Sequence, residues 1–372
     1  MMILIKVLQC WIRNDEPVNF PEITINSIPS KLMLHVSSTS GTGQKCLFAF
    51  IMSLHNLRYV IKLWGISLDA VFEANVNIIL YFLGQICIFS LFHLKYNNTF
   101  VEKVEDLWND FQIEFDNETR KYFWTRKVFY YSATVFSKIC YLIYDMSKTY
   151  HNWPYSDSEK LRNEVDYWFG VIRLAIIYPF FICQDCILFD LSITAETAIE
   201  YIESQSKRIY KESLKDEKAL HFKVIHDLRL KYLQTHRLAN KMNEFISPCL
   251  PVFLLIYMQH FIYLVYLILF VQQSQFLLIS RIIACIGAFP VTIVYIYSTA
   301  QVYKKSQQLL MTVYKLSLKT DYLKALNEIT LFVNCNEIGF SLGGICMITS
   351  SAITTTFSFI ATLIIAIPSF AR

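Results

Sequence analysis

Six stretches of this 372-residue chain are each long and apolar enough to cross a lipid bilayer, which takes about 20 mostly apolar residues in one helix. They are residues 72–94, 128–146, 169–192, 245–271, 276–299 and 338–368. A seventh stretch, 46–64, has a suitable length but is interrupted by His55, Arg58 and Lys62. The chain is 54% hydrophobic and only 17% charged, so it has more apolar surface than one soluble core can hide. The sequence predicts an all-α protein with seven transmembrane helices, held in the cell membrane as a multi-pass protein.

The distribution of Lys and Arg predicts which side of the membrane each terminus occupies, because cytoplasmic segments are enriched in these residues. The segments on one side hold 25 Lys and Arg residues, and those on the other side hold 4. The first set is 1–45, 95–127, 193–244 and 301–336, and the second is 147–168 and 272–281. We therefore expect a cytoplasmic N-terminus and an extracellular C-terminus. This orientation is opposite to that of G-protein-coupled receptors, so no G protein is expected as a partner.

Two segments outside the bilayer have the character of helices. No Pro or Gly occurs between Thr194 and Glu244, and apolar residues recur there every four positions. We expect long cytoplasmic helix extensions, although an ordinary solvated helical hairpin also fits this segment. The predicted organisation has an N-terminal arm, four spans, an anchor segment, two spans, a second anchor segment and a last span. Their bounds are 1–45, 46–192, 193–244, 245–299, 301–336 and 337–372.

Two glycosylation sequons test this topology. They begin at Asn97 and Asn117 and fall in the segment 95–127, which the charge count places in the cytoplasm. Glycans are added on the opposite side of the membrane, so neither asparagine is expected to carry one.

Several functional classes have no support in the sequence. The net charge of +4 is too small for a nucleic-acid binder. The pair Cys183 and Cys186 has redox or zinc spacing but lies in an apolar stretch, where small residues pack helices. No HExxH motif is present. We therefore expect no enzyme activity, no metal site and no cofactor.

The last predicted span is unusual in its chemistry. It carries no charge between Glu337 and Arg372, yet it holds ten Ser and Thr residues. The spacing of Gly339 and Gly343 allows another helix to approach closely, so both are expected at a helix contact. A helix with uncharged hydroxyl groups suits a pore that carries hydrated ions. A packed central helix, whose hydroxyls bond to their own backbone carbonyls, is the alternative.

The C-terminal residues resemble the signature of insect gustatory receptors. The similarity runs from Phe340-Ser-Leu-Gly-Gly344 to the sequence that ends at Phe370, about the last 32 residues. The family has Thr-Tyr, five mostly apolar residues and Gln-Phe at this end. Here Thr362 and Phe370 match at the right spacing, whereas Leu363 replaces the Tyr and Ser369 replaces the Gln. Insect odorant receptors share the organisation of seven spans with a weaker match at this end.

The resemblance implies a ligand-gated cation channel in the membrane of sensory neuron dendrites. Receptors of this family are homo- or hetero-tetramers of chemoreceptor subunits, and their last helix lines a central pore. The pore-lining candidates carried over to this chain are Thr349, Ala352, Thr356, Thr362, Ser369 and Phe370. The loss of the Gln and the presence of Pro368 alter the expected outer mouth of the pore.

The outward halves of spans two to six are the predicted site of a small organic tastant, since aromatic faces with a few polar groups suit such a ligand. The candidates are Glu73, Asn75, Tyr141, Tyr144, Arg173, His260 and Tyr263. Interfacial Tyr, a packed histidine and an ion pair between Arg173 and Glu73 explain the same residues without a ligand. The predicted orientation places Asp185 in the inward half of span four, near the cytoplasmic helices.

Two other functions remain open on the sequence. One is an odorant receptor subunit of the same architecture. The other is a membrane transporter without a channel, although transporters usually have internal repeats and this chain shows none.

Overall fold

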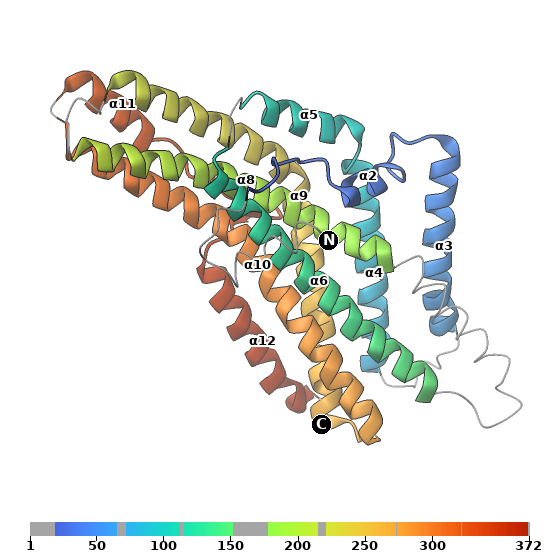
Figure 1. The fold of residues 1–372 in the computed structure, drawn as a ribbon. Coiled ribbons are helices and arrows are strands. Elements are labelled where there is room, and N and C mark those ends of the chain that lie inside the picture. The colour runs from blue at the N-terminus through green and yellow to red at the C-terminus, as the bar shows by residue number, and fades with distance from the viewer. Residues whose placement is uncertain are drawn as a thin grey trace, which may run out of the picture.

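A computed structural model of the chain describes residues 19–64, 72–111, 115–151, 178–214, 221–272, 274–320 and 322–370. In these ranges the chain is almost entirely helical, which confirms the predicted all-α class (Figure 1). The helices are α2 (Ile28–Leu34), α3 (Thr42–Trp64), α4 (Phe72–Lys95), α5 (Asn98–Asn109), α6 (Asn117–His151), α8 (Tyr178–Ser213), α9 (Phe222–Phe270), α10 (Gln275–Ser317), α11 (Leu323–Val333) and α12 (Ser351–Phe370). Strands β1 (Ser341–Leu342) and β2 (Cys346–Met347) precede α12.

Helix α8 is the centre of the bundle. It packs against α6, α9, α10 and the short N-terminal α2. Of its residues 180–199, all but Ile182 are buried, including polar ones such as Gln184 and Glu196. A helix that is surrounded on every side must place its polar residues against partners from its neighbours, because water does not reach them. This position explains why the acids of α8 are all paired.

Three helices are longer than a bilayer is thick. Helix α8 has 36 residues, α9 has 49 and α10 has 43. At 1.5 Å per residue these are about 54, 74 and 65 Å, against about 30 Å for the hydrocarbon core. The long helical extensions predicted from the lack of Pro and Gly are therefore present. Figure 1 shows them continuing together, with α11 folded back beside them.

The spans themselves are confirmed only in part. Among the described residues, α9 and α10 are long and apolar enough to cross a membrane. A third span is added if Ile79–Lys95 and α5, which meet at an angle of 64°, are taken together. The other predicted spans fall on α3, α6, α8 and α12. Of these, α6 and α8 carry charged and tyrosine side chains within the predicted spans, and these side chains lower the mean hydropathy of both helices.

The last span begins later than predicted. It was expected from residue 338, but α12 starts at Ser351, and a two-stranded hairpin occupies the preceding residues. The hairpin turn contains Gly343 at φ +60° and Gly344 at φ +76°, a left-handed conformation that no other residue adopts as readily. The Gly343 N–H donates to the carbonyl of Ser247 on α9 at 3.0 Å.

The expected helix contact through Gly339 and Gly343 is therefore wrong, since neither glycine lies in a helix. Gly343 supplies the turn. Gly339 allows close packing of another kind, because an added Cβ would lie 2.7 Å from Met347 Cε of the hairpin and 3.1 Å from a ring carbon of Tyr303 on α10.

Candidate functional site

Four helices meet at one buried carboxylate, Asp185 of α8. The Lys138 ammonium group of α6 lies 2.9 Å from this carboxylate and also donates to the Tyr257 hydroxyl of α9 at 2.6 Å. Tyr257 donates to both Asp185 oxygens, at 3.1 and 2.9 Å. Tyr295 of α10 donates to the same carboxylate. We call these four residues the polar floor.

The polar floor fixes the helices relative to one another. Asp185 is 1% exposed and Lys138 is 8% exposed, so both charges have lost their water. A buried ion pair is tolerated when further hydrogen bonds satisfy its remaining polar atoms, and the two tyrosine hydroxyls do so here. The Lys138 ammonium also lies over the rings of Phe181 and Tyr257, 5.5 and 5.1 Å from their centroids.

An aromatic layer lies one helical turn further along α6 and α9. Tyr141 follows Lys138 by three residues, and His260 follows Tyr257 by three, so each stays on the same helix face. The Tyr141 and His260 ring centroids are 5.0 Å apart, and Tyr81 of α4 lies 6.3 Å from His260. The hydroxyl of Tyr141 interacts electrostatically with those of Tyr81 and Tyr257.

A third layer continues outward by another turn. The Tyr144 hydroxyl of α6 interacts with Arg281 of α10 and with the Tyr263 hydroxyl of α9. Tyr144 packs in a small apolar cluster with Leu264 and Ala284, separate from the main core. Beside it, Tyr178 at the start of α8 donates to Asp145 of α6 at 2.7 Å. The three layers together stack aromatic side chains above a charged, hydrogen-bonded base.

The structure brings together four of the seven predicted ligand residues, namely Tyr141, Tyr144, His260 and Tyr263. Arg173 lies outside the described residues. Glu73 and Asn75 are in the first turns of α4, and their side chains lie outside the described part of the chain.

Sequence reasoning missed the residues of the polar floor. Asp185 lies one helical turn from the Tyr141 and His260 layer. One signal pointed to it: Lys138 is the single Lys of the predicted span 128–146, and Asp185 is one of two Asp residues in the predicted span 169–192, so the two could form a pair. Tyr257 and Tyr295 gave no such signal, since tyrosine is common throughout the spans.

Two further ion pairs follow Asp185 along α8. Asp190 forms an ion pair with Lys127 at 2.8 Å and accepts a hydrogen bond from the Tyr131 hydroxyl at 2.7 Å, and both partners lie on α6. About one and a half turns further along α8, the Glu196 carboxylate forms an ion pair with the Arg126 guanidinium group at 3.6 Å. Because α6 and α8 pack together along this length, Asp185, Asp190 and Glu196 each pair with a cation of α6.

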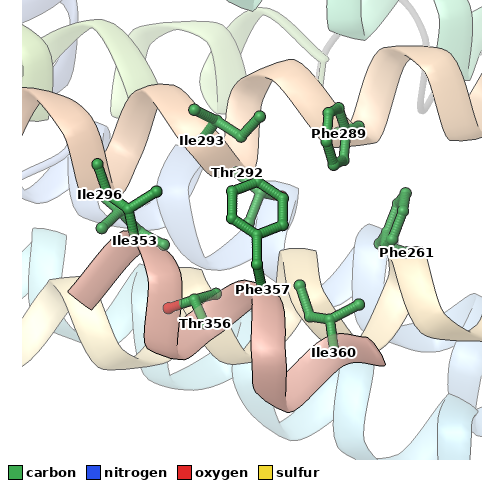
Figure 2. Close-up of a pocket in the computed structure, with 9 residues that line it drawn as sticks. All are labelled: Phe261, Phe289, Thr292, Ile293, Ile296, Ile353, Thr356, Phe357 and Ile360. Atoms are coloured by element: carbon green, nitrogen blue, oxygen red, sulfur yellow. The ribbon is translucent and has the colours of Figure 1, made fainter. Parts of the chain in front are cut away.

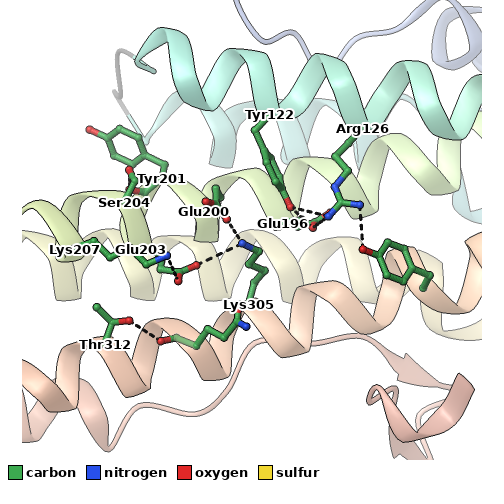
Figure 3. A network of polar contacts seen from close by, with 12 residues as sticks. Tyr122, Arg126, Glu196, Glu200, Tyr201, Glu203, Ser204, Lys207, Lys305 and Thr312 are labelled. Carbon is green, nitrogen blue, oxygen red and sulfur yellow. Dashed lines mark hydrogen bonds and ion pairs between the residues drawn. The ribbon is translucent and has the colours of Figure 1, made fainter. Parts of the chain in front are cut away.

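The network around Glu196 extends to α10 (Figure 3). Tyr122 donates to Glu196, and Arg126 donates to the Tyr297 hydroxyl at 3.2 Å. Lys305 of α10 bridges to Glu200 and, at 3.6 Å, to Glu203. Burial raises the pKa of Glu196 above its ordinary value, although Arg126 and the Tyr122 hydrogen bond act to lower it. These contacts join the long helices beyond the predicted spans.

Helix α12 has one buried and one exposed face. Its buried face contains Ile353, Thr356 and Ile360, which line a small apolar pocket against α9 and α10. Its exposed face carries a stripe of hydroxyl side chains at helical spacing, which are Ser351, Thr355, Ser358 and Thr362. The Thr355 and Thr362 hydroxyls donate to the carbonyls of Ser351 and Ser358 at 3.1 and 2.8 Å, so both are exposed while bonded to their own helix.

The predicted pore-lining residues divide between these faces. Thr362 is exposed, and Thr349 lies just before the helix, where its hydroxyl is 2.6 Å from that of Ser351. Thr356 lines the pocket against α9 and α10, and Ala352 packs against the main core, so neither lies on the exposed face. The side chains of Ser369 and Phe370, at the end of α12, lie outside the described part.

Comparison with known proteins gives a relationship at the level of fold. At the level of sequence, no protein-family model matches the chain, and neither does any curated protein. The chain is similar to the solved structure of the insect olfactory receptor OR5 from Machilis hrabei, with a TM-score of 0.66, 13% identity, and coverage of 98% of this chain and 97% of that one. The same receptor in complex with eugenol gives a TM-score of 0.68, 13% identity, and coverage of 99% and 98%. The chain therefore has the fold of an insect olfactory receptor over nearly its whole length.

Proposed function

We propose that this chain is a chemoreceptor subunit, a ligand-gated cation channel opened by a small organic molecule. The observation that carries the proposal is the layered site in the helix bundle, where Tyr81, Tyr141 and His260 stand above the Lys138 and Asp185 pair. Aromatic walls with a few fixed polar groups suit a compact, mostly apolar ligand that carries one hydrogen-bonding group. Similarity of fold to an olfactory receptor solved with eugenol supports a ligand of this size class.

The conduction pathway is proposed along the exposed face of α12. Four copies of the chain around one axis would each contribute the stripe Ser351, Thr355, Ser358 and Thr362 to a wet, uncharged passage. Ala352 and Thr356, which the sequence predicted to line the pore, are not part of this stripe. Ligand binding among α4, α6 and α9 would expand the bundle, move α12 outward and admit cations.

A taste receptor is the leading form of this proposal, because Thr362 and Phe370 keep the spacing of the gustatory signature. An odorant receptor subunit is the second candidate, favoured by the similarity of fold to an olfactory receptor. The ligand panel below separates the two, since a subunit that needs a co-receptor gives no current when expressed alone. In either form the chain is placed in the cell membrane of a sensory neuron, with a cytoplasmic N-terminus.

The test is expression of the full chain, alone and with a co-receptor subunit, followed by current recording with panels of small organic compounds. A cation current that requires both the compound and an intact Tyr141 supports the proposal. Surface-expressed protein that gives no current under either condition overturns it. The matched variant Tyr314→Ala is the control, because Tyr314 is 51% exposed on α10, far along the helix from the site.

A further inference from the structure

A small apolar pocket separates α12 from the rest of its own subunit. Its lining consists of seven hydrocarbon side chains and two threonines from α9, α10 and α12 (Figure 2). These residues are Phe261, Phe289, Thr292, Ile293, Ile296, Ile353, Thr356, Phe357 and Ile360. The Thr292 hydroxyl donates to the Ala288 carbonyl of its own helix at 2.9 Å, which leaves its methyl group for the pocket. Such a lining offers water no hydrogen-bonding partners, so it favours a hydrocarbon group over water.

Phe289 of α10 is the point where the three helices meet. Its ring centroid lies 5.7 Å from that of Phe261 on α9 and 5.6 Å from that of Phe357 on α12. Figure 2 shows these rings pointing into the space between α10 and α12. Phe289 is also 40% exposed, so the pocket reaches the outer surface of the molecule at this residue.

An exposed apolar stripe on α10 leads to this opening. Ile279, Ile282 and Ile286 are 58%, 40% and 53% exposed. Together with Phe289 and the half-buried Ile293 they recur every three or four residues, so they share one face of the helix. From Ile279 to Ile293 the stripe is about 21 Å long, comparable with the roughly 15 Å thickness of one leaflet's acyl chains.

The depth of the pocket also fits hydrocarbon. The ends of α9 and α12 and the start of α10 lie at the same end of the molecule (Figure 1). Counted from these ends, Phe261, Phe289 and Ile360 lie about 14 to 21 Å along the helices, within a hydrocarbon core about 30 Å thick, and Ile296 lies near its far boundary. Helices α9 and α10 are also the two described helices whose length and hydropathy allow them to cross a membrane.

We infer that this pocket and the α10 stripe form a binding site for one alkyl chain of a bilayer lipid. The alkyl chain lies along Ile279, Ile282 and Ile286, passes Phe289 and ends between Ile293 and Thr356. There it contacts both α10 and the inner face of α12, and so it sets how closely α12 approaches its subunit. The influence of the bound alkyl chain on channel opening rests on the proposed function, but the binding of that alkyl chain does not.

The experiment is photolabelling of the full chain in phosphatidylcholine vesicles that contain a phosphatidylcholine with a diazirine on one acyl chain. Labelled peptides are identified by mass spectrometry, with exposed Leu255 of α9 as the reference for general contact with lipid. We expect labelling of residues 289–296 and 353–357 to exceed that of the reference. Labelling no greater than at Leu255, or absent from these residues because a second copy of the chain covers them, overturns the inference.

Two substitutions on α12 provide the matched comparison. Thr356→Trp fills the pocket, and Ser358→Trp places the same bulk on the opposite, exposed face. Filling the room for about one methyl group should reduce labelling about fourfold in Thr356→Trp and leave Ser358→Trp unchanged. Ile296→Ala, which enlarges the pocket, should increase labelling and covers the case in which Thr356→Trp fails to fold. Equal labelling of all three variants contradicts the inference.

A second arm distinguishes the source of the alkyl chain. A free fatty acid that carries the same diazirine is added to vesicles of unlabelled lipid. If the free acid labels the pocket and the phospholipid probe does not, the inference of a bilayer lipid is wrong. None of these measurements requires a current, so their failure is distinct from failure of the channel proposal.

Discussion

The ammonium group of Lys138 lies 2.9 Å from a carboxylate oxygen of Asp185, and both side chains are buried between α6 and α8. The two residues come from different predicted spans, and each carries a charge in a mostly apolar stretch. Their pairing, completed by the hydroxyls of Tyr257 and Tyr295, forms the base of the candidate ligand site and fixes four helices at one level. The first prediction concerns this pair.

Lys138→Met leaves the Asp185 carboxylate buried without its cation. We expect the variant to be destabilised by about 3–5 kcal/mol, the typical effect of removing one partner of a buried pair. The double variant Lys138→Met with Asp185→Asn removes both charges and keeps an acceptor for the two tyrosines, so it should recover much of the loss. Thermal unfolding in detergent measures both. A single variant that unfolds at the temperature of the wild type would show that the pair does not stabilise the bundle.

Tyr141→Ala removes an aromatic wall of the site next to His260. If an activating compound packs there, the concentration needed for half-maximal current should rise on the order of tenfold, which corresponds to the loss of about 1.4 kcal/mol of contact. Tyr141→Phe tests the hydroxyl alone. Tyr314→Ala, made at an exposed tyrosine, should leave the dose–response curve unchanged. An equal shift in both alanine variants would place the ligand elsewhere.

The exposed stripe of α12 should be reachable by a positively charged thiol reagent from the pore. Ser358→Cys is expected to lose most of its current on treatment, because the modified side chain places bulk and charge in the passage. Thr356→Cys faces the apolar pocket of its own subunit and should be insensitive. The untreated and treated wild type provide the background from native cysteines such as the exposed Cys346. Sensitivity at Thr356 in place of Ser358 would contradict the assignment of the two faces.

Gly344→Ala tests the hairpin that precedes α12. An added Cβ meets nothing within 4 Å, but the backbone lies at φ +76°, so the substitution introduces strain without a clash. The left-handed conformation should destabilise the variant by about 1–2 kcal/mol. Gly43→Ala is the matched control, since its Cβ also meets nothing within 4 Å and Gly43 lies in helix α3. Equal melting temperatures for the two variants would show that the hairpin does not limit stability.

Neither sequon should carry a glycan. The count of Lys and Arg predicts that both asparagines are in the cytoplasm, and glycans are added on the other side of the membrane. Treatment of protein from insect cells with a glycosidase should therefore cause no change in electrophoretic mobility. A shift that disappears in Asn97→Gln or Asn117→Gln would place this segment outside the cell and reverse the predicted orientation.

Part of the candidate site could be predicted from the sequence. Tyr141 and His260 were selected because aromatic and polar groups in the outward halves of spans suit a ligand, and the structure places their rings 5.0 Å apart. Tyr257 and Tyr295 were not distinguishable from the other tyrosines of the chain. Their role depends on facing Asp185, which lies 72 and 110 residues away from them along the chain.

The last helix shows a second limit. Composition indicated an uncharged helix rich in hydroxyls, and α12 is one. The same composition placed Gly343 inside that helix, because a Gly at four-residue spacing is typical of a helix contact and also of a turn. The hydrogen bond from Gly343 to Ser247 on α9, a contact over 96 residues of chain, favours the turn.

The sequence by itself determined the class of this protein and its helices. A run of apolar residues in lipid has to satisfy its own backbone hydrogen bonds, and a long stretch without Pro or Gly continues that helix beyond the bilayer, so both properties are local. The tertiary structure alone decided which faces meet. It set the rotation of α6, α8, α9 and α10 that gathers the polar floor, and the rotation of α12 that turns Thr356 toward its own subunit and exposes Ser358. Rotation of a helix about its axis leaves its own hydrogen bonds unchanged, so packing against distant parts of the chain selects it.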